Sequence, residues 1–385
     1  MNIRKQPYNI DFIGNRPEYV LLPSAQEEAR ASVWFSVETD GETATTPQFH
    51  LFGNGNGINV PVSILKAYFK GRDIPAAGET AAAIPCGKSL MHAVLHYSPS
   101  GSVRDKTSGE VLLVNGAIDQ YAADNNMPDW AALTQEKFWR KAFSDIFGQD
   151  NADTVVSDTE TEQYLYVANF TPEAENSCNL MVEENRSGSV REYIAATVNI
   201  PAQTIVRIPC GVEALGIAES DTLTAYTVKL YAPYCISRTF MMRPHPWSAH
   251  TALLVNRTGM LETFVFNNIT ETASSEGEEV LTGRNRRYLH SSHGSVFTAR
   301  TGLRTEKELA ILRSALHEDG NVLIDGEYAW NISFEPSSAT IVDREKDLLE
   351  VEVNFLKGEK TSRKKTQLDS IGSDSRIERT DYIIK

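Results

Sequence analysis

The stretch TLTAYTVKLY, from Thr222 to Tyr231, shows the pattern that decides the fold class of this chain. Its apolar residues alternate with more polar ones, so that an extended strand would have one apolar face and one wet face. Such alternation is typical of antiparallel sheets with one buried face. Similar runs lie at Ala31–Val37, Met91–Tyr97 and Arg191–Ile200. The sequence therefore predicts a mainly β protein.

The length of 385 residues exceeds what one hydrophobic core usually supports. We expect two or three β-sandwich-like domains, two amphipathic helices and a flexible C-terminal arm. The predicted divisions are an N-terminal β domain (1–126), a helix and linker (127–163), a second β region (164–234), a C-terminal α+β block (235–357) and the arm (358–385). Within the second division, the polar run Asp150–Gln163 is the predicted linker.

Two segments repeat their apolar residues at helical spacing. Met127–Gln149 begins with Asp129 as a candidate cap, and Arg304–His317 has Thr305 in the same role. Between the β runs, the polar segment Asn267–Asn285 is predicted to be an exposed loop. The sequence thus predicts two helices inserted among strands.

Charge and composition exclude several classes of protein. The net charge of −14 disfavours nucleic-acid binding. No stretch has the roughly 18 apolar residues of a membrane span, and the N-terminus lacks the apolar core of a signal peptide. We therefore expect a protein without a membrane span that is made in a cytoplasm.

The four cysteines are widely spaced and form no C-x-x-C pair, so we expect reduced, buried thiols and no zinc module. They are Cys86, Cys178, Cys210 and Cys235. Two of them lie in a repeated tetrapeptide, Ile84–Gly87 and Ile208–Gly211. The repeat has two explanations, a shared turn preference or duplicated domains, and the flanking residues do not align.

No motif for catalysis or for a cofactor is evident. Gly87-Lys88-Ser89 resembles the end of a phosphate-binding loop, but Ala82 stands where the first glycine is needed. His92 and His96 have zinc-ligand spacing only if they lie on a helix, and their segment has the pattern of a strand. We therefore expect neither an enzyme nor a bound cofactor or metal.

A β-hairpin is predicted where Thr251–Asn256 and Leu261–Phe266 flank a short turn. Gly259 in that turn is free to take positive φ. Two apolar strands and a glycine turn are the usual signature of a hairpin.

This hairpin also carries a resemblance. HTALLVNRTGMLETFVF, from His250 to Phe266, resembles an L-N-R-G-x-x-E/D-x-F-x-F hairpin of structural proteins from phages and prophages of gut Bacteroidetes. The opening Ile10–Pro17 (IDFIGNRP) is similar to the I-x-F-S-G-N-P start of those proteins, although Ile13 and Arg16 depart from it. The resemblance implies a virion protein of the tail or baseplate that forms, or attaches to, a homo-oligomeric ring with other virion proteins. It implies no catalytic residues.

The C-terminal arm contains the candidate interaction residues. Its basic cluster is Arg363, Lys364 and Lys365, and its apolar tip is Tyr382, Ile383 and Ile384. The tip either docks on an adjacent subunit, with the basic cluster along an acidic neighbour, or has no function. The cluster is otherwise a solvated surface.

Two other functions stay open at this point. The first is a receptor- or glycan-binding adhesion module of the same particle, which would gather surface aromatics in a groove. The tryptophans that would do so are Trp34, Trp130, Trp139, Trp247 and Trp330. The second is a tail-borne polysaccharide-degrading enzyme, which would bring two carboxylates together in a cleft.

Overall fold

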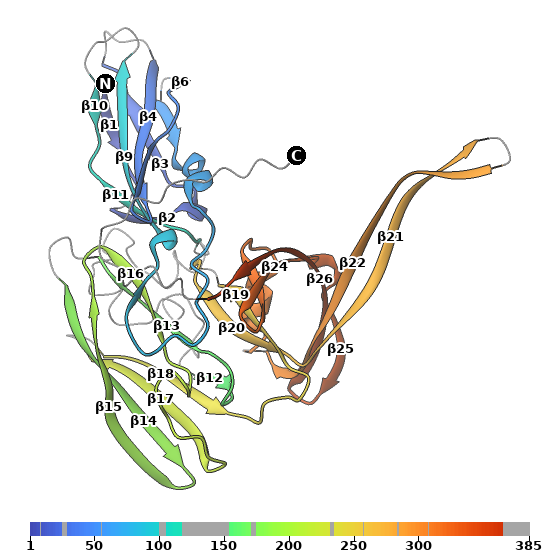
Figure 1. Ribbon diagram of the computed structural model, residues 1–385. Coiled ribbons are helices and arrows are strands. Elements are labelled where there is room, and N and C mark those ends of the chain that lie inside the picture. The colour runs from blue at the N-terminus through green and yellow to red at the C-terminus, as the bar shows by residue number, and fades with distance from the viewer. Residues whose placement is uncertain are drawn as a thin grey trace, which may run out of the picture.

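A computed structural model describes most of the chain, and in these ranges the protein is mainly β, as predicted. The described residues are 1–7, 9–24, 29–54, 56–99, 105–117, 154–170, 175–231, 235–256, 258–282, 285–306 and 308–364. Their strands form five sheets, grouped in three blocks that Figure 1 shows around a common centre. The predicted helix at Met127–Gln149 lies outside the described residues.

The N-terminal block is a sandwich of two sheets. One sheet contains β1 (Asn2–Lys5), β3 (Glu18–Leu22) and β7 (Ile58–Pro61). The other contains β2 (Ile10–Phe12), β11 (Val111–Val114), β9 (Leu90–Pro99), β4 (Arg30–Thr39), β5 (Glu42–Thr45), β6 (Phe49–Phe52) and β10 (Lys106–Thr107). Alternate residues such as Tyr19, Phe35 and Leu95 are buried between the sheets. The 3-10 helix η2 (Val62–Tyr68) adds Leu65 to this core.

The second block is also a two-layered sandwich. Its larger sheet has the order β12 (Thr154–Ser157), β18 (Cys235–Met242), β17 (Leu223–Tyr231), β14 (Asn176–Arg186) and β15 (Ser189–Ile200). The smaller sheet has the order β13 (Tyr164–Asn169), β16 (Thr204–Pro209) and β8 (Ile84–Pro85). Strand β8 comes from the N-terminal part of the chain and contains the start of the first copy of the repeated tetrapeptide; it pairs with Val206 and Arg207 of β16, directly before the second copy. The repeat therefore marks neighbouring strands in one sheet.

The third block is a sheet that curls round on itself. Its strand order is β20 (Leu261–Phe266), β19 (His250–Val255), β23 (Asn321–Asp325), β24 (Tyr328–Phe334), β26 (Leu348–Ser362), β22 (Asn285–Thr305) and β21 (Asn268–Thr282), with β25 (Thr340–Glu345) beside β26. Only Asn267 separates β20 from β21 in the chain, and its N–H donates to the carbonyl oxygen of Arg300 in β22 (2.8 Å). The two ends of the strand order therefore meet, and the short helix α3 (Ala310–Ala315) packs against β19 and β20.

A shared hydrophobic core joins the three blocks. The N-terminal block contributes Phe12 and Val114, the second block Tyr166, and the third block Val255 and other buried residues of β19, β20 and β23. Strand β13 is buried on both faces, because its alternate residues point into this core and into the core of the second block. The blocks are thus held in one arrangement by buried apolar surface.

Two predicted boundaries are wrong. The predicted linker contains a strand, because Thr154–Ser157 form β12, which pairs in parallel with β18. The predicted boundary at residue 235 separates β18 from its own sheet, since β18 is the neighbour of β17. Both errors make the predicted second block too short, because the block begins at residue 154 and continues to Met242.

Three predicted elements differ in extent from the structure. Asn267–Asn285 is not a loop, because most of it is β21, which forms a long hairpin with β22 (Figure 1). The predicted helix Arg304–His317 is reduced to α3; Thr305 and Glu308 exchange hydrogen bonds as in a capping box, but the regular helix begins only at Ala310. The arm begins later than residue 358, because Gly358–Ser362 continue β26 beside β24.

The turn between β19 and β20 lies against the N-terminal block. Gly259 has a φ of +86°, as predicted for this hairpin. A Cβ atom on Gly259 would overlap the carbonyl oxygen of Asn115, and one on Gly116 would overlap Thr258. Arg72 donates hydrogen bonds to the carbonyl oxygens of both Asn115 and Gly259. Glycine is therefore required here both for its backbone conformation and for the close approach of two blocks.

We predict that Gly259→Val lowers the free energy of unfolding by at least about 4 kcal/mol, since it adds a backbone clash to the strain of positive φ. Gly188→Val is the matched control, because Gly188 has a φ of +96° but no atom within 4 Å of its added Cβ. The control should lose about 1–3 kcal/mol from strain alone. Urea denaturation of both variants measures the difference, and equal losses would show that the turn does not dock against Asn115.

Candidate functional site

A segment without regular structure crosses the centre of the molecule. Residues 71–83, called the strap, connect η2 to β8. The N–H of Ala77 donates to the carbonyl oxygen of Arg363 (3.1 Å) in the third block, and the N–H of Ala81 donates to Ala214 (3.3 Å) in the second. The strap is therefore hydrogen-bonded to both of the other blocks.

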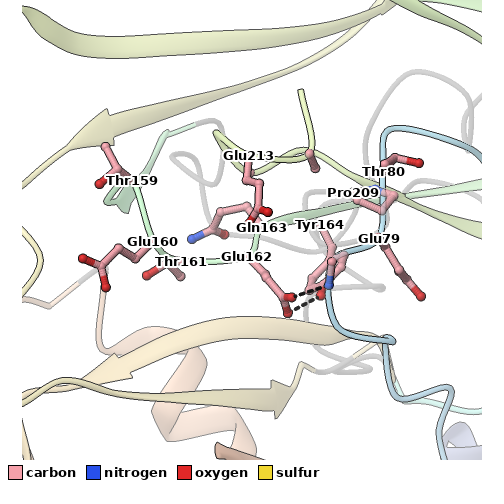
Figure 2. Close-up of a pocket in the computed structure, with 13 residues that line it drawn as sticks. Glu79, Thr80, Thr159, Glu160, Thr161, Glu162, Gln163, Tyr164, Pro209 and Glu213 are labelled. Carbon is pink, nitrogen blue, oxygen red and sulfur yellow. Dashed lines mark hydrogen bonds between the residues drawn. The ribbon is translucent and has the colours of Figure 1, made fainter. Parts of the chain in front are cut away.

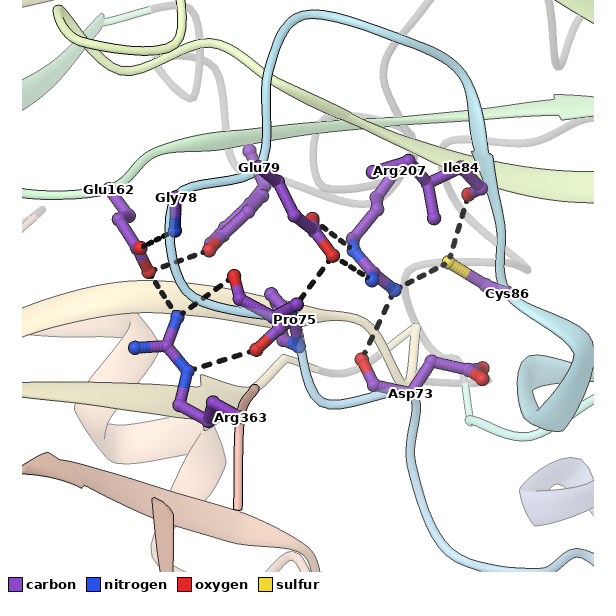
Figure 3. Close-up of polar contacts among 11 residues, drawn as sticks. Asp73, Pro75, Gly78, Glu79, Ile84, Cys86, Glu162, Arg207 and Arg363 are labelled. Atoms are coloured by element: carbon purple, nitrogen blue, oxygen red, sulfur yellow. Dashed lines mark hydrogen bonds and ion pairs between the residues drawn. The ribbon is translucent and has the colours of Figure 1, made fainter. Parts of the chain in front are cut away.

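The strap is held to the second block by a buried ion pair. Arg207 of β16 donates from Nε and Nη2 to the two carboxylate oxygens of Glu79 at 3.0 and 2.5 Å (Figure 3). Both side chains are more than nine-tenths buried. Burial by itself lowers the pKa of Arg207, but the hydrogen bonds with Glu79 reverse this and raise it above its ordinary value. The guanidinium therefore stays charged inside the protein.

A second arginine holds the strap to the third block. Arg363, directly after β26, donates from Nε to the carbonyl oxygen of Pro75 (2.9 Å) and from Nη2 to the carboxylate of Glu162 (Figure 3). Glu162 also accepts hydrogen bonds from the N–H of Gly78 (3.2 Å) and the hydroxyl of Tyr164 (2.9 Å). This arrangement connects the strap, the second block and the end of β26.

The interaction role predicted for Arg363 is therefore wrong. Its side chain is only 2% exposed and is bonded within its own chain, so it is not available to a neighbouring subunit. Lys364 is exposed and forms an ion pair with Glu327 (2.8 Å), which raises the pKa of Lys364. Lys365, Tyr382, Ile383 and Ile384 lie outside the described residues and stay predictions.

A small acidic pocket lies beside the strap (Figure 2). It has a volume of about 170 Å³, and its lining includes Glu79, Glu160, Glu162 and Glu213. Glu79 and Glu162 are each bound to a buried arginine. A polysaccharide-degrading site needs a carboxyl group that gives up a proton and a second that takes part in the reaction. These two carboxylates instead serve to hold the strap.

The motif that resembles a phosphate-binding loop has a structural explanation. Gly87–Ser89 form a 3-10 turn, η3, in which the N–H of Lys88 donates to the carboxylate of Asp73 at 3.0 Å. The hydroxyl of Ser89 donates to the same oxygen at 3.3 Å. Burial raises the pKa of Asp73, although Arg207 and the Lys88 amide act against this. A carboxylate of the strap therefore occupies the place that a phosphate would need.

The cysteine side chains that the structure describes are buried, as predicted, and are those of Cys86, Cys178 and Cys210. Burial raises the pKa of Cys86 and of Cys210 to about 12. Among the described residues no group of histidines, cysteines and carboxylates is arranged to hold a metal ion. No helix in the described part of the chain is long and apolar enough to cross a membrane.

The described tryptophans do not gather in one groove. Trp247 is fully exposed, and Trp330 lies beneath Lys357 and Lys360. Trp34 stands on the outer face of the N-terminal sandwich. Trp130 and Trp139 lie outside the described residues.

The outer face around Trp34 is polar, and the sequence alone did not predict that its side chains lie together. Trp34 stacks on His96, with ring centroids 5.3 Å apart and an angle of 6° between the rings. His96 lies 2.8 Å from the hydroxyl of Ser36, and the next histidine along β9, His92, lies 3.1 Å from Glu110. An open hollow beside them is lined by Ser36, Glu38, Thr43, Thr45, His92 and Glu110. Alternation along β4 and β9 brings these side chains to one face, because residues two apart point the same way.

Comparison with known proteins adds no family: no family model matches the chain, and no curated protein matches it.

We predict that Glu79→Gln and Arg207→Met each lower the free energy of unfolding by about 3–5 kcal/mol, because each leaves the partner buried without its counter-charge. The double variant should lose less than the sum of the two. Glu18→Gln is the control, since its ion pair with Lys5 is exposed and should be worth at most about 1 kcal/mol. Urea melts of the four variants test this, and single losses no larger than that of Glu18→Gln would contradict it.

Proposed function

We propose that this protein is a structural subunit of a phage or phage-like particle, in the tail or baseplate, where it assembles with other copies and other virion proteins into a ring. The observation that carries the proposal is the hairpin of β21 and β22. Strand β22 pairs with β26 only from Phe297 onward. Its first twelve residues, Asn285–Val296, pair in the described part of the chain with β21 alone. Figure 1 shows this part standing away from the body of the molecule.

A hairpin of this kind is poorly supported by its own subunit. Two strands without a third strand or a packed layer are only marginally stable in water. Both of its outer edges also present unpaired backbone groups to any strand that approaches. An assembly accounts for such an element, because a neighbouring subunit supplies the missing contacts.

The rest of the molecule suits the same function. A shared core and two buried arginine–carboxylate pairs hold the three blocks in one arrangement. A subunit that keeps its shape presents its contact surfaces in a constant geometry, as a closed ring requires. The hairpin that carries most of the resemblance to phage structural proteins is β19 and β20, at the centre of this arrangement.

The proposal predicts that the hairpin is needed for assembly and not for folding. Residues 274–294 are replaced by Asn-Gly, a turn that joins the paired residues Ala273 and Ser295. Mass photometry should find the full chain as an oligomer and the shortened chain as a monomer with an unchanged thermal melt. A chain that ends at Lys365 keeps the hairpin and should still assemble. A full chain that stays monomeric at micromolar concentration would refute the proposal.

A second candidate function is receptor or glycan binding by the outer face of β4 and β9. The favouring observation is the hollow beside Trp34, where an aromatic ring stands next to hydroxyl, imidazole and carboxylate groups. Sugars offer hydroxyl groups to such polar side chains and C–H faces to an aromatic ring. The face belongs to the N-terminal block, well away from the hairpin (Figure 1).

For this second function we predict that Trp34→Ala weakens binding to immobilised neutral and acidic oligosaccharides at least tenfold. Trp247→Ala is the control, because Trp247 is fully exposed and lies in another part of the molecule. Biolayer interferometry with both variants measures the effect. Equal binding by Trp34→Ala and the unaltered chain, or binding by neither, would exclude this face as a glycan site.

A further inference from the structure

The second block has a long strand edge without a neighbour. Strand β15 has twelve residues and pairs, in the described part of the chain, with β14 alone. Its residues Val190 and Ile194 are 64% and 57% exposed. The strand also carries Arg191 and Glu192, and these are bound within the subunit, by the ring of Tyr193 and by Lys229. An exposed edge strand of this length is a template for pairing with another strand. The edge is therefore an open position for one more strand.

The hairpin and this edge match in length. Beyond the part of β22 that pairs with β26, the hairpin strands have eleven and twelve residues, at 272–282 and 285–296, and β15 has twelve. At roughly 3.3 Å per residue, the two edges are each about 40 Å long. Eleven or twelve residues of ladder pairing are thus available on both sides.

The two edges do not meet within one molecule. Figure 1 shows the hairpin at one extremity and β15 at the opposite side of the body, with the junction of the three blocks between them. A contact between them therefore needs two copies of the chain. Such a contact joins different surfaces of the two copies, and repetition of it generates a ring if the rotation closes.

Other edges fit less well. Strand β25 exposes Ile341 and Val342, but it has six residues and continues with Asp343, Arg344 and Glu345. A strand of six residues offers half the ladder that β15 offers. The same strand also belongs to the block from which the hairpin arises.

We infer that the hairpin of one copy adds to the edge of β15 in the next copy, so that the five-stranded sheet of each subunit is extended by its neighbour. This inference rests on the proposed function and names the surface that receives the hairpin. Main-chain hydrogen bonds supply the affinity of such an addition, and Val190 and Ile194 are covered by it. The partner is a second copy of this chain.

The test uses a double variant, Val190→Lys with Ile194→Lys, in the full chain. Both residues are exposed, so the subunit should fold and melt as before, while lysines on the edge block pairing. Mass photometry should find this variant monomeric at concentrations where the unaltered chain is oligomeric. Ile341→Lys with Val342→Lys on β25 is the matched control and should assemble normally.

Mixing two defective chains gives the sharper result. The chain with the shortened hairpin keeps β15, and the lysine variant keeps the hairpin. Each should be monomeric alone, and together they should form a one-to-one dimer and nothing larger. If the lysine variant assembles like the unaltered chain while the shortened chain does not, the hairpin binds elsewhere: the proposed function survives and this inference fails. If the unaltered chain is monomeric, both fail.

Discussion

Two buried arginines determine how the parts of this molecule are placed. A guanidinium removed from water costs several kcal/mol unless a counter-charge accompanies it, so Arg207 and Arg363 each require a carboxylate at a defined position. Those carboxylates are Glu79 in the strap and Glu162 just before β13. The strap has no regular structure of its own, and its course follows from these pairs and their accompanying hydrogen bonds. The strap leads directly into β8, which pairs with β16 beside the shared core.

The sequence predicted correctly those strands in which alternating apolar residues mark a buried face. The alternating runs of β4, β9 and β17 were located correctly because each of these strands has one buried face. Segment 267–285 shows no such alternation in its sequence, so no period of two marks it as a strand. The end of β26 was missed for a related reason, because Lys360 lies over the rings of Tyr328 and Trp330 and not in a core. These contacts depend on a partner strand that local sequence does not reveal.

The candidate site could not be predicted from the sequence, for a different reason. Arg363 stands in a run of polar residues and has the local appearance of a solvated side chain, yet its partners Glu162 and Pro75 are 201 and 288 positions away. The hairpin turn was recognised, and the structure shows what its motif does. The side chain of Asn256 accepts from the N–H of Met260 and donates to Glu262, while Gly259 permits contact with Asn115. The residues of this hairpin turn thus build the central contact between the third block and the N-terminal block.

The continuity of β20 and β21 through Asn267 has a mechanical consequence. One run of chain is first a strand of the closed sheet and then a strand of the projecting hairpin, and β22 makes the same passage in reverse. A pull on the hairpin tip is therefore transmitted along two strands that are paired on the body with β19 and β26. The ladder is loaded lengthwise, in shear, so that many hydrogen bonds resist together instead of opening one after another. The hairpin is therefore anchored in the body of the molecule by both of its strands.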